Sequence, residues 1–220
     1  MYIGIPKESR PFEYRVGLSP AGVEILSQNG HQVFVQHEAG LGSGFSDQEY
    51  EKSGARIAFS AEEVLGRADL VLKIARPIKE EMEWLKDGSI LAGLLHLASS
   101  SQDQIDLLLE KKITALAYEQ ITDASGALSV LRPFSWMCGA MIPQIAARLL
   151  QNNWGGKGIL LSGLPGVPPA EVVIIGGGVV GMSATKSLVG AGAHVTVIDK
   201  NIAALEAVAE RFPGVVTMIS

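Results

Sequence analysis

The sequence predicts an α/β fold with two Rossmann-like parallel-sheet domains, the second of them truncated. Short apolar segments rich in β-branched residues alternate with helical segments along the chain, which is typical of a mostly parallel sheet covered on both faces. A glycine fingerprint near residue 176 then opens a second such unit. The residues after it suffice for one βαβ unit, a helix and a strand, whereas a complete doubly wound fold has two βαβαβ halves.

The expected elements follow from apolar periodicity and from helix start and stop signals. Ser19-Pro20, for example, matches an N-cap followed by proline at the first helical position. Strands are expected near residues 2–5, 31–35, 56–57, 70–73, 90–95, 113–117, 172–175, 194–198 and 215–219. Helices are expected near residues 22–29, 60–67, 79–85, 102–110, 134–150 and 203–211, with a short one from Asp47 and another after Gly181. We place one domain at 1–133 and a linker helix with an incomplete second domain at 134–220.

The composition is that of an ordinary globular protein. The 220 residues are 47% apolar and 19% charged, and the formal net charge is -5. Because the basic residues are scattered, neither nucleic acid nor a membrane surface is expected as a partner. No apolar run approaches the ~18 residues that a bilayer requires, so we expect a cytoplasmic protein. A single cysteine, Cys138, excludes an intrachain disulfide, and no metal-ligand motif occurs.

The glycine fingerprint predicts a dinucleotide site. Val172–Ile175 reads as a strand that enters a G-x-G-x-x-G turn and then a helix. The first glycine allows the turn, the second lets the backbone approach a pyrophosphate, and the third lets the helix pack closely on the strand. The phosphates would lie at the positive end of the helix. We expect cofactor contacts from Gly176, Gly178, Val179, Val180 and Gly181.

The carboxylate of Asp199 favours NAD over NADP. Asp199 stands at the end of the next expected strand, where it can accept hydrogen bonds from ribose hydroxyls and repel the extra phosphate of NADP. Lys200 weakens that preference slightly. The alternative, a glycine-rich turn without a ligand, explains neither the third glycine nor the placement of this carboxylate.

Three side chains of the first domain are candidates for chemistry, because ligands of open α/β folds collect at the carboxyl ends of the strands. Arg15 follows the first strand and can grip a carboxylate with its two-pronged guanidinium. Lys73 ends a strand and can polarise a carbonyl oxygen, and His96 ends another and can transfer protons. Each also has a structural interpretation, as a solvated loop arginine, a sheet-edge lysine reaching water, or a structural histidine. We expect all three to face one crevice.

Several motifs, in collinear order over nearly the whole chain, resemble the alanine dehydrogenase family, which shares its fold with the α subunit of NAD(P) transhydrogenase. These motifs are Gly4–Glu8, Tyr14–Val23, Gly40–Asp47, Asp69–Lys73, Leu95–Ala98, Ala117–Glu119 and Pro165–Val167. The resemblance implies NAD-dependent oxidative deamination of L-alanine to pyruvate and ammonia, and the reverse reaction. It makes residues 1–133 the substrate domain and 134–220 the linker helix and the first part of the NAD-binding domain.

The resemblance also implies roles for individual residues. Arg15 and Lys73 would hold the carboxylate and carbonyl of pyruvate, and His96 would be the acid/base on the imine or carbinolamine step. Ser135 matches a serine that touches the cofactor. His96 separates the dehydrogenase branch from the transhydrogenase branch. A homo-oligomer, a dimer or hexamer formed through the linker helix, is expected.

The sequence also departs from the family pattern. After Lys73 the family usually reads Lys-Glu-Pro, but here the segment is Ala75-Arg76-Pro77. The linker helix commonly begins Met-Ser-Glu-Val-Ala-Gly-Arg, but here it reads as residues 134–140, Phe-Ser-Trp-Met-Cys-Gly-Ala. The catalytic aspartate of the family would lie beyond Ser220, so we expect this stretch by itself to be inactive. Two alternatives stay open: a transhydrogenase α-like subunit, and a non-catalytic NAD-binding or assembly module.

Overall fold

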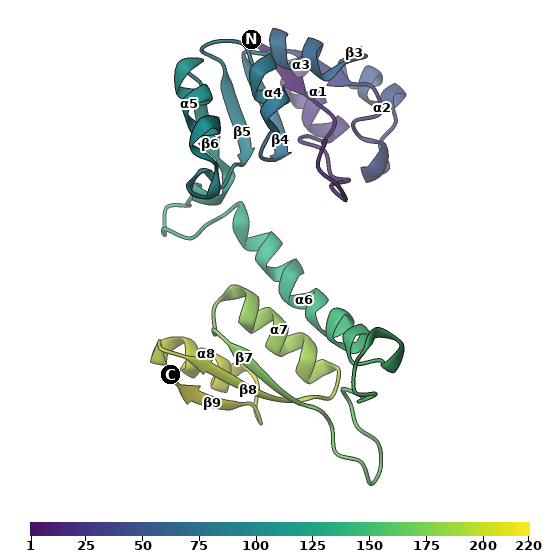
Figure 1. The fold of residues 1–220 in the computed structure, drawn as a ribbon, viewed down its shortest axis with the longest axis vertical. Coiled ribbons are helices and arrows are strands. Elements are labelled where there is room, and N and C mark those ends of the chain that lie inside the picture. Colours follow the sequence, from purple (N-terminus) through teal and green to yellow (C-terminus); the bar gives the residue numbers. More distant parts are fainter. The chain divides into compact units, whose positions relative to one another are not determined.

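The computed structural model describes residues 1–220, which form two compact units, Met1–Ile121 and Thr122–Ser220 (Figure 1). The boundary suggested by the sequence, between residues 133 and 134, falls inside helix α6 (Leu131–Leu149), and the assignment of domains to functions stays a prediction. No helix has the length and apolar character needed to cross a membrane.

The first unit contains a six-stranded, fully parallel sheet in the order β3-β2-β1-β4-β5-β6. Its strands are β1 (Tyr2–Ile5), β2 (Gln32–Gln36), β3 (Arg56–Ala58), β4 (Leu70–Ala75), β5 (Ile90–Leu94) and β6 (Thr114–Ala117). Its helices are α1 (Pro20–Gln28), α2 (Asp47–Lys52), α3 (Ala61–Arg67), α4 (Lys79–Trp84) and α5 (Gln102–Glu110). The α/β fold expected from the alternating pattern is confirmed.

Two apolar clusters hold this sheet to its helices. One contains Ile3, Ile5, Val33 and Val35 of the central strands with Val23 of α1 and Tyr50 of α2. The other contains Val71 and Leu91 of β4 and β5 with Leu65, Met82, Leu85 and Leu108 of the neighbouring helical segments. Since both clusters lie between the sheet and its helices, the strand ends remain available to polar side chains.

Local sequence sets where these helices begin. Ser19 caps α1, where its Oγ accepts a hydrogen bond from the amide of Gly22, and Pro20 takes the first helical position as predicted. Ser46 and Glu49 form a capping box at the start of α2. Each cap satisfies amide groups that have no partner within the helix.

The second unit contains a three-stranded parallel sheet in the order β7-β8-β9. Its strands are β7 (Glu171–Ile175), β8 (His194–Asp199) and β9 (Val216–Ile219), and its helices are α6, α7 (Val179–Gly190) and α8 (Ile202–Arg211). Helix α6 begins at Leu131, before the expected Phe134, because Pro133 falls in the first turn, where its missing amide hydrogen costs no bond. Leu188, Val197 and Val208 belong to the core of this unit.

Candidate functional site

A hollow of about 250 Å³ lies at the carboxyl ends of β1, β4 and β5. Its lining includes Arg10 and Arg15 from the segment after β1, Arg76 directly after β4, and His96 and Ser99 after β5. The structure thus brings Arg15 and His96 to one crevice, as the strand-end argument predicts. No carboxylate is among the residues that line it.

Arg15 presents a guanidinium that is held by a neighbouring acid. Its Nε and Nη2 donate hydrogen bonds to Oε1 and Oε2 of Glu13, at 2.8 Å and 2.6 Å. These hydrogen bonds lower the pKa of the Glu13 carboxyl, which partial burial alone would raise. The bidentate pair fixes the orientation of the guanidinium, which lines the hollow.

His96 stands in a left-handed backbone conformation at the end of β5, with φ 44 and ψ 47. Its amide donates to Oε1 of Glu119 at 2.6 Å, and the amide of Leu95 donates to Oε2 of the same carboxylate at 3.1 Å. Its carbonyl oxygen accepts from the amide of Ser99 at 2.9 Å and from Arg76 Nη1 at 3.3 Å. The peptide is therefore fixed on both sides, while the imidazole is 59% exposed.

Lys73 does not occupy the position expected for it. The strand continues to Ala75, which still pairs with Leu94 of β5, so Lys73 lies inside β4 and is 1% exposed. Its Nζ lies 3.0 Å from Glu81 Oε1 and 3.3 Å from Glu8 Oε2. The interpretation that Lys73 ends its strand and faces the crevice is wrong, because two buried carboxylates hold its ammonium below the hollow lining.

Sequence reasoning assigned no role to Glu119, Arg10 or Arg76. Glu119 lies in the short turn Tyr118–Gln120 that follows β6, so the strand-end argument used for His96 could have found it. Arg76 also follows its strand, but the expected end at Lys73 concealed this. Arg10 lies in the same segment after β1 as Arg15 and closer to the strand end, so the same argument could have found it. Its Nε donates a hydrogen bond to the carbonyl oxygen of Arg76 at 3.0 Å.

The glycine turn of the second unit has the stereochemistry that a dinucleotide site needs. Gly176 has φ 103, a conformation that favours glycine. A Cβ on Gly181 would overlap the carbonyl oxygen of Gly176, so only glycine permits this approach of α7 to the turn. No side chain caps the start of α7 at Gly178, so its first amides remain available for an anion.

Asp199 lies beside this turn at the end of β8. Its Oδ1 accepts from the amide of Asn201 at 2.8 Å, and its Oδ2 accepts from the amide of Gly177 at 2.6 Å. These backbone hydrogen bonds, that from Asn201 above all, hold the pKa of the carboxyl below its usual value. An ionised carboxylate has lone pairs left for ribose hydroxyls.

A second hollow, of about 760 Å³, opens over the turn. Gly177, Gly178 and Val179 line it together with Trp136 and Arg132 of α6. Ser135 is not among the lining residues, and its Oγ donates to the carbonyl oxygen of Leu131 at 3.3 Å. Its contact with a cofactor stays a prediction.

Helix α6 packs closely on α7 at one glycine. A Cβ on Gly139 would come within 2.5 Å of the Val180 carbonyl oxygen and of the Ser183 Cβ. Ser183 also donates from its Oγ to the carbonyl oxygen of Trp136 at 2.7 Å. These contacts place Trp136 and Gly139 of α6 against the first turns of α7.

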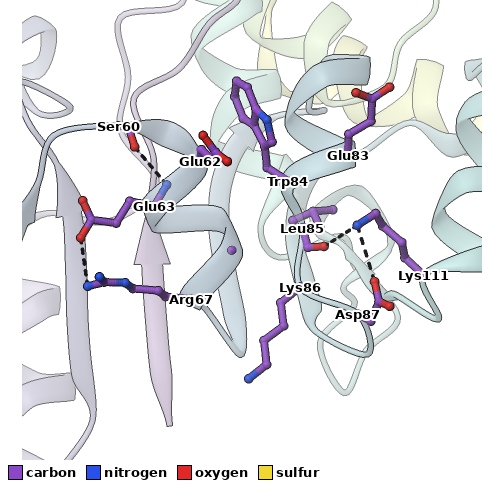
Figure 2. A pocket seen from close by; sticks show the side chains of 11 residues that line it. Ser60, Glu62, Glu63, Arg67, Glu83, Trp84, Leu85, Lys86, Asp87 and Lys111 are labelled. Carbon is purple, nitrogen blue, oxygen red and sulfur yellow. Dashed lines mark hydrogen bonds and ion pairs between the residues drawn. The ribbon is translucent and has the colours of Figure 1, made fainter.

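A third hollow, of about 600 Å³, lies at the opposite, amino ends of the strands (Figure 2). Both of its pairs of opposite charges lie within the site: Arg67 with Glu63 at 2.9 Å, and Lys111 with Asp87 at 3.5 Å, while Lys86 pairs with Asp69 outside the lining. Lys111 also donates to the carbonyl oxygen of Leu85 at 2.8 Å. Since these groups already satisfy one another, we place no chemistry there.

Two family models match the chain. The model described as "Alanine dehydrogenase/PNT, N-terminal domain" matches residues 4–138, and the model described as "Alanine dehydrogenase/PNT, C-terminal domain" matches residues 142–220. The chain belongs to the alanine dehydrogenase/PNT family. The resemblance seen in its motifs is thereby confirmed.

Similar curated proteins and solved structures support the same family. Alanine dehydrogenase of Methanococcus maripaludis is 46% identical over 219 residues, which is 100% of this chain and 58% of that protein. A structure of L-alanine dehydrogenase is similar at a TM-score of 0.91 and 39% identity, over 100% of this chain and 61% of that one. A structure of transhydrogenase from Sinorhizobium meliloti is similar at a TM-score of 0.78 and 30% identity, over 99% of this chain and 61% of that one. The chain thus spans less than two thirds of these relatives.

Proposed function

We propose that the protein carrying this chain is an NAD-dependent amino acid dehydrogenase that interconverts L-alanine with pyruvate and ammonia. The observation that carries the proposal is the meeting of Arg15 and His96 in one hollow at the strand ends. Membership of the family and the alanine dehydrogenase named among its relatives support the same activity. We place it in the cytoplasm, as a homo-oligomer acting on small molecules.

The second unit would hold the cofactor. The turn at Gly176–Gly178 and the first amides of α7 fit a pyrophosphate, and Asp199 fits the ribose hydroxyls of NAD. The tight approach at Gly181, where no Cβ fits, is the structural feature that such a site requires. When bound, the nicotinamide supplies or accepts the hydride.

The first unit would hold the substrate and move protons. Arg15, oriented by Glu13, binds the carboxylate of the 2-oxo acid through charge-assisted hydrogen bonds. His96 has its backbone fixed by Glu119 and its imidazole exposed at the hollow, so it can give or take a proton on the substrate nitrogen or oxygen. Lys73 has a positioning role in this proposal. Its ammonium pairs with the carboxylate of Glu8, and this carboxylate accepts a hydrogen bond from the amide of Ile74.

The test is NADH oxidation by the full-length polypeptide with pyruvate and ammonia, followed at 340 nm in the wild type and in His96→Ala. We expect turnover in the wild type, and in the variant a loss of about 100-fold or more in kcat with NADH binding retained. Retained turnover in His96→Ala would remove the proton-transfer role from this residue. Hydride transfer to an oxidised nucleotide without use of pyruvate would instead favour the transhydrogenase alternative.

A further inference from the structure

We propose that the hollow at the strand ends also accepts a 2-oxo acid that carries a second carboxylate, and that Arg76 is the residue that binds this second group. The proposal rests on the proposed dehydrogenase function and adds a second substrate class to it. Alanine has a methyl side chain with no charge to offer an arginine, so this substrate class lies beyond the proposed reaction.

The hollow carries more positive charge than one carboxylate needs. Three guanidinium groups, those of Arg10, Arg15 and Arg76, line it, and no acid does. Arg15 is paired with Glu13. Arg10 and Arg76 form no ion pair within the first unit, since both bind only neutral oxygen atoms there. Two uncompensated cations in one small hollow repel each other and favour an anion between them.

Arg76 is held in place by groups that leave its charge intact. Its Nη1 donates to Ser100 Oγ at 2.8 Å, and also reaches Ser99 Oγ and the carbonyl oxygen of His96. A guanidinium that neutral oxygen atoms position in advance keeps its full charge and is suited to bind a planar carboxylate.

The neighbouring residue leaves room for such a group. Ala75 lines the same hollow with a methyl side chain, directly before Arg76. A substrate with a second carboxylate would pair with Arg76, whereas pyruvate would leave this charge unpaired in the occupied site.

The experiment compares kcat/KM of the full-length enzyme for pyruvate with those for oxaloacetate and 2-oxoglutarate, in the wild type and in Arg76→Gln. We expect the wild type to use a dicarboxylate as well as pyruvate, and Arg76→Gln to lower kcat/KM for the dicarboxylate by about 10- to 100-fold more than kcat/KM for pyruvate. Arg76→Lys should recover part of the loss because the charge remains. The control is Arg67→Gln, because Arg67 is an exposed arginine of the third hollow. It should change kcat/KM neither for pyruvate nor for the dicarboxylates.

Two outcomes would overturn the inference while leaving the proposed function standing. One is a wild type that uses pyruvate but neither dicarboxylate. The other is an equal loss for all substrates in Arg76→Gln, which would mean that Arg76 only positions the turn at His96. If no 2-oxo acid is used, the proposed function fails instead. The binding preference is then judged by calorimetry of the 220-residue chain with succinate and propionate. Tighter binding of succinate that Arg76→Gln abolishes would support a dicarboxylate site, and equal binding would refute it.

Discussion

Lys73 is part of a buried cluster of charged side chains. Its ammonium is enclosed by the carboxylates of Glu8 and Glu81, and all three side chains are 1–2% exposed. Burial raises the pKa of Glu8, against the opposing effect of Lys73 and of the amide of Ile74. A buried cluster with two acids and one base is stable only while the base is present.

Replacing Lys73 by methionine should therefore destabilise the first unit by about 3–5 kcal/mol at neutral pH, since two buried carboxylates lose their partner. Denaturant unfolding of the 220-residue chain measures this. Lys86→Met is the matched control: its ion pair with Asp69 is 47% and 33% exposed, so a loss of about 1 kcal/mol or less is expected. Equal losses in the two variants would contradict a buried cluster.

The same cluster makes the stability of the first unit depend on pH. Because the folded-state pKa of Glu8 is raised above 4.5, the folded state binds its proton more tightly than the unfolded state. The contribution of Glu8 to the free energy of unfolding therefore increases as the pH falls through the raised pKa towards 4.5. This contribution is lost when the pH rises above the raised pKa. The destabilisation of Lys73→Met should shrink between pH 7 and about pH 5, which repeated unfolding curves would show. A difference between variant and wild type that does not change with pH would exclude protonation of Glu8 as its cause.

Asp199 provides a prediction on cofactor choice. Its low pKa keeps it ionised near neutral pH, so Asp199→Ala should weaken NAD binding and relax discrimination against NADP. Titration of both nucleotides against the full-length protein measures the ratio. Asp199→Asn keeps an acceptor for the Gly177 amide and should retain the turn while losing the charge. An unchanged preference in both variants would place the ribose contact elsewhere.

At the level of elements, the turn between β7 and α7 depends on glycine at particular positions. The amide of Gly176 donates to the carbonyl oxygen of Ile198 at 2.7 Å, while its own carbonyl occupies the space beside Gly181. Thr185 Oγ1 donates to the carbonyl oxygen of Gly181 at 2.8 Å and is fully buried. The first bond ties the turn to the end of β8, and the second lies within the first turns of α7.

Gly181→Ala should separate α7 from the turn, because its Cβ has no space. We expect loss of NAD binding and a destabilisation of about 1–3 kcal/mol, the usual effect of overpacking. Gly190→Ala is the control in the same helix: nothing lies within 4 Å of the added Cβ, and alanine favours helix by about 1 kcal/mol. Thermal unfolding measures the stability of both variants, and nucleotide titration measures their NAD binding. Equal effects in the two variants would contradict the prediction.

At the level of the whole molecule, one face of the second sheet is open within residues 122–220. The register places Ile175, Ile198 and Met218 side by side on that face, with Val173 and Val216 in the row beside them. Ile175 is 86% exposed and Val173 is 60% exposed. The opposite face carries Val195 and Val197, which pack in the core of this unit.

An exposed apolar sheet face favours association. We expect Ile175→Thr combined with Met218→Thr to raise the solubility of the 220-residue chain and reduce its binding of a hydrophobic dye, with little change in its melting temperature. Light scattering and dye fluorescence measure these effects. A large fall in melting temperature would show that these side chains are packed rather than exposed. Val197→Thr, in the core, should by contrast destabilise the unit.

Much of the fold could be predicted because its evidence is local. The apolar run at 172–175 and the cap at Ser19 depend on neighbouring residues, and both elements lie where expected. Arg15 and His96 could be paired because parallel strands end at one edge of a sheet. Lys73 could not be placed, because nothing local shows that its strand runs on to Ala75.

By itself, the sequence determined the order of strands and helices, the glycine turn at Gly176 and the presence of Arg15 and His96 at strand ends. Periodicity and the stereochemistry of single residues are enough for these. Only the tertiary structure decided that the charge of Lys73 is enclosed and that Arg76 lines the hollow instead. The physical reason is that burial and ion pairing arise from contacts between residues far apart in the chain, which no local pattern records.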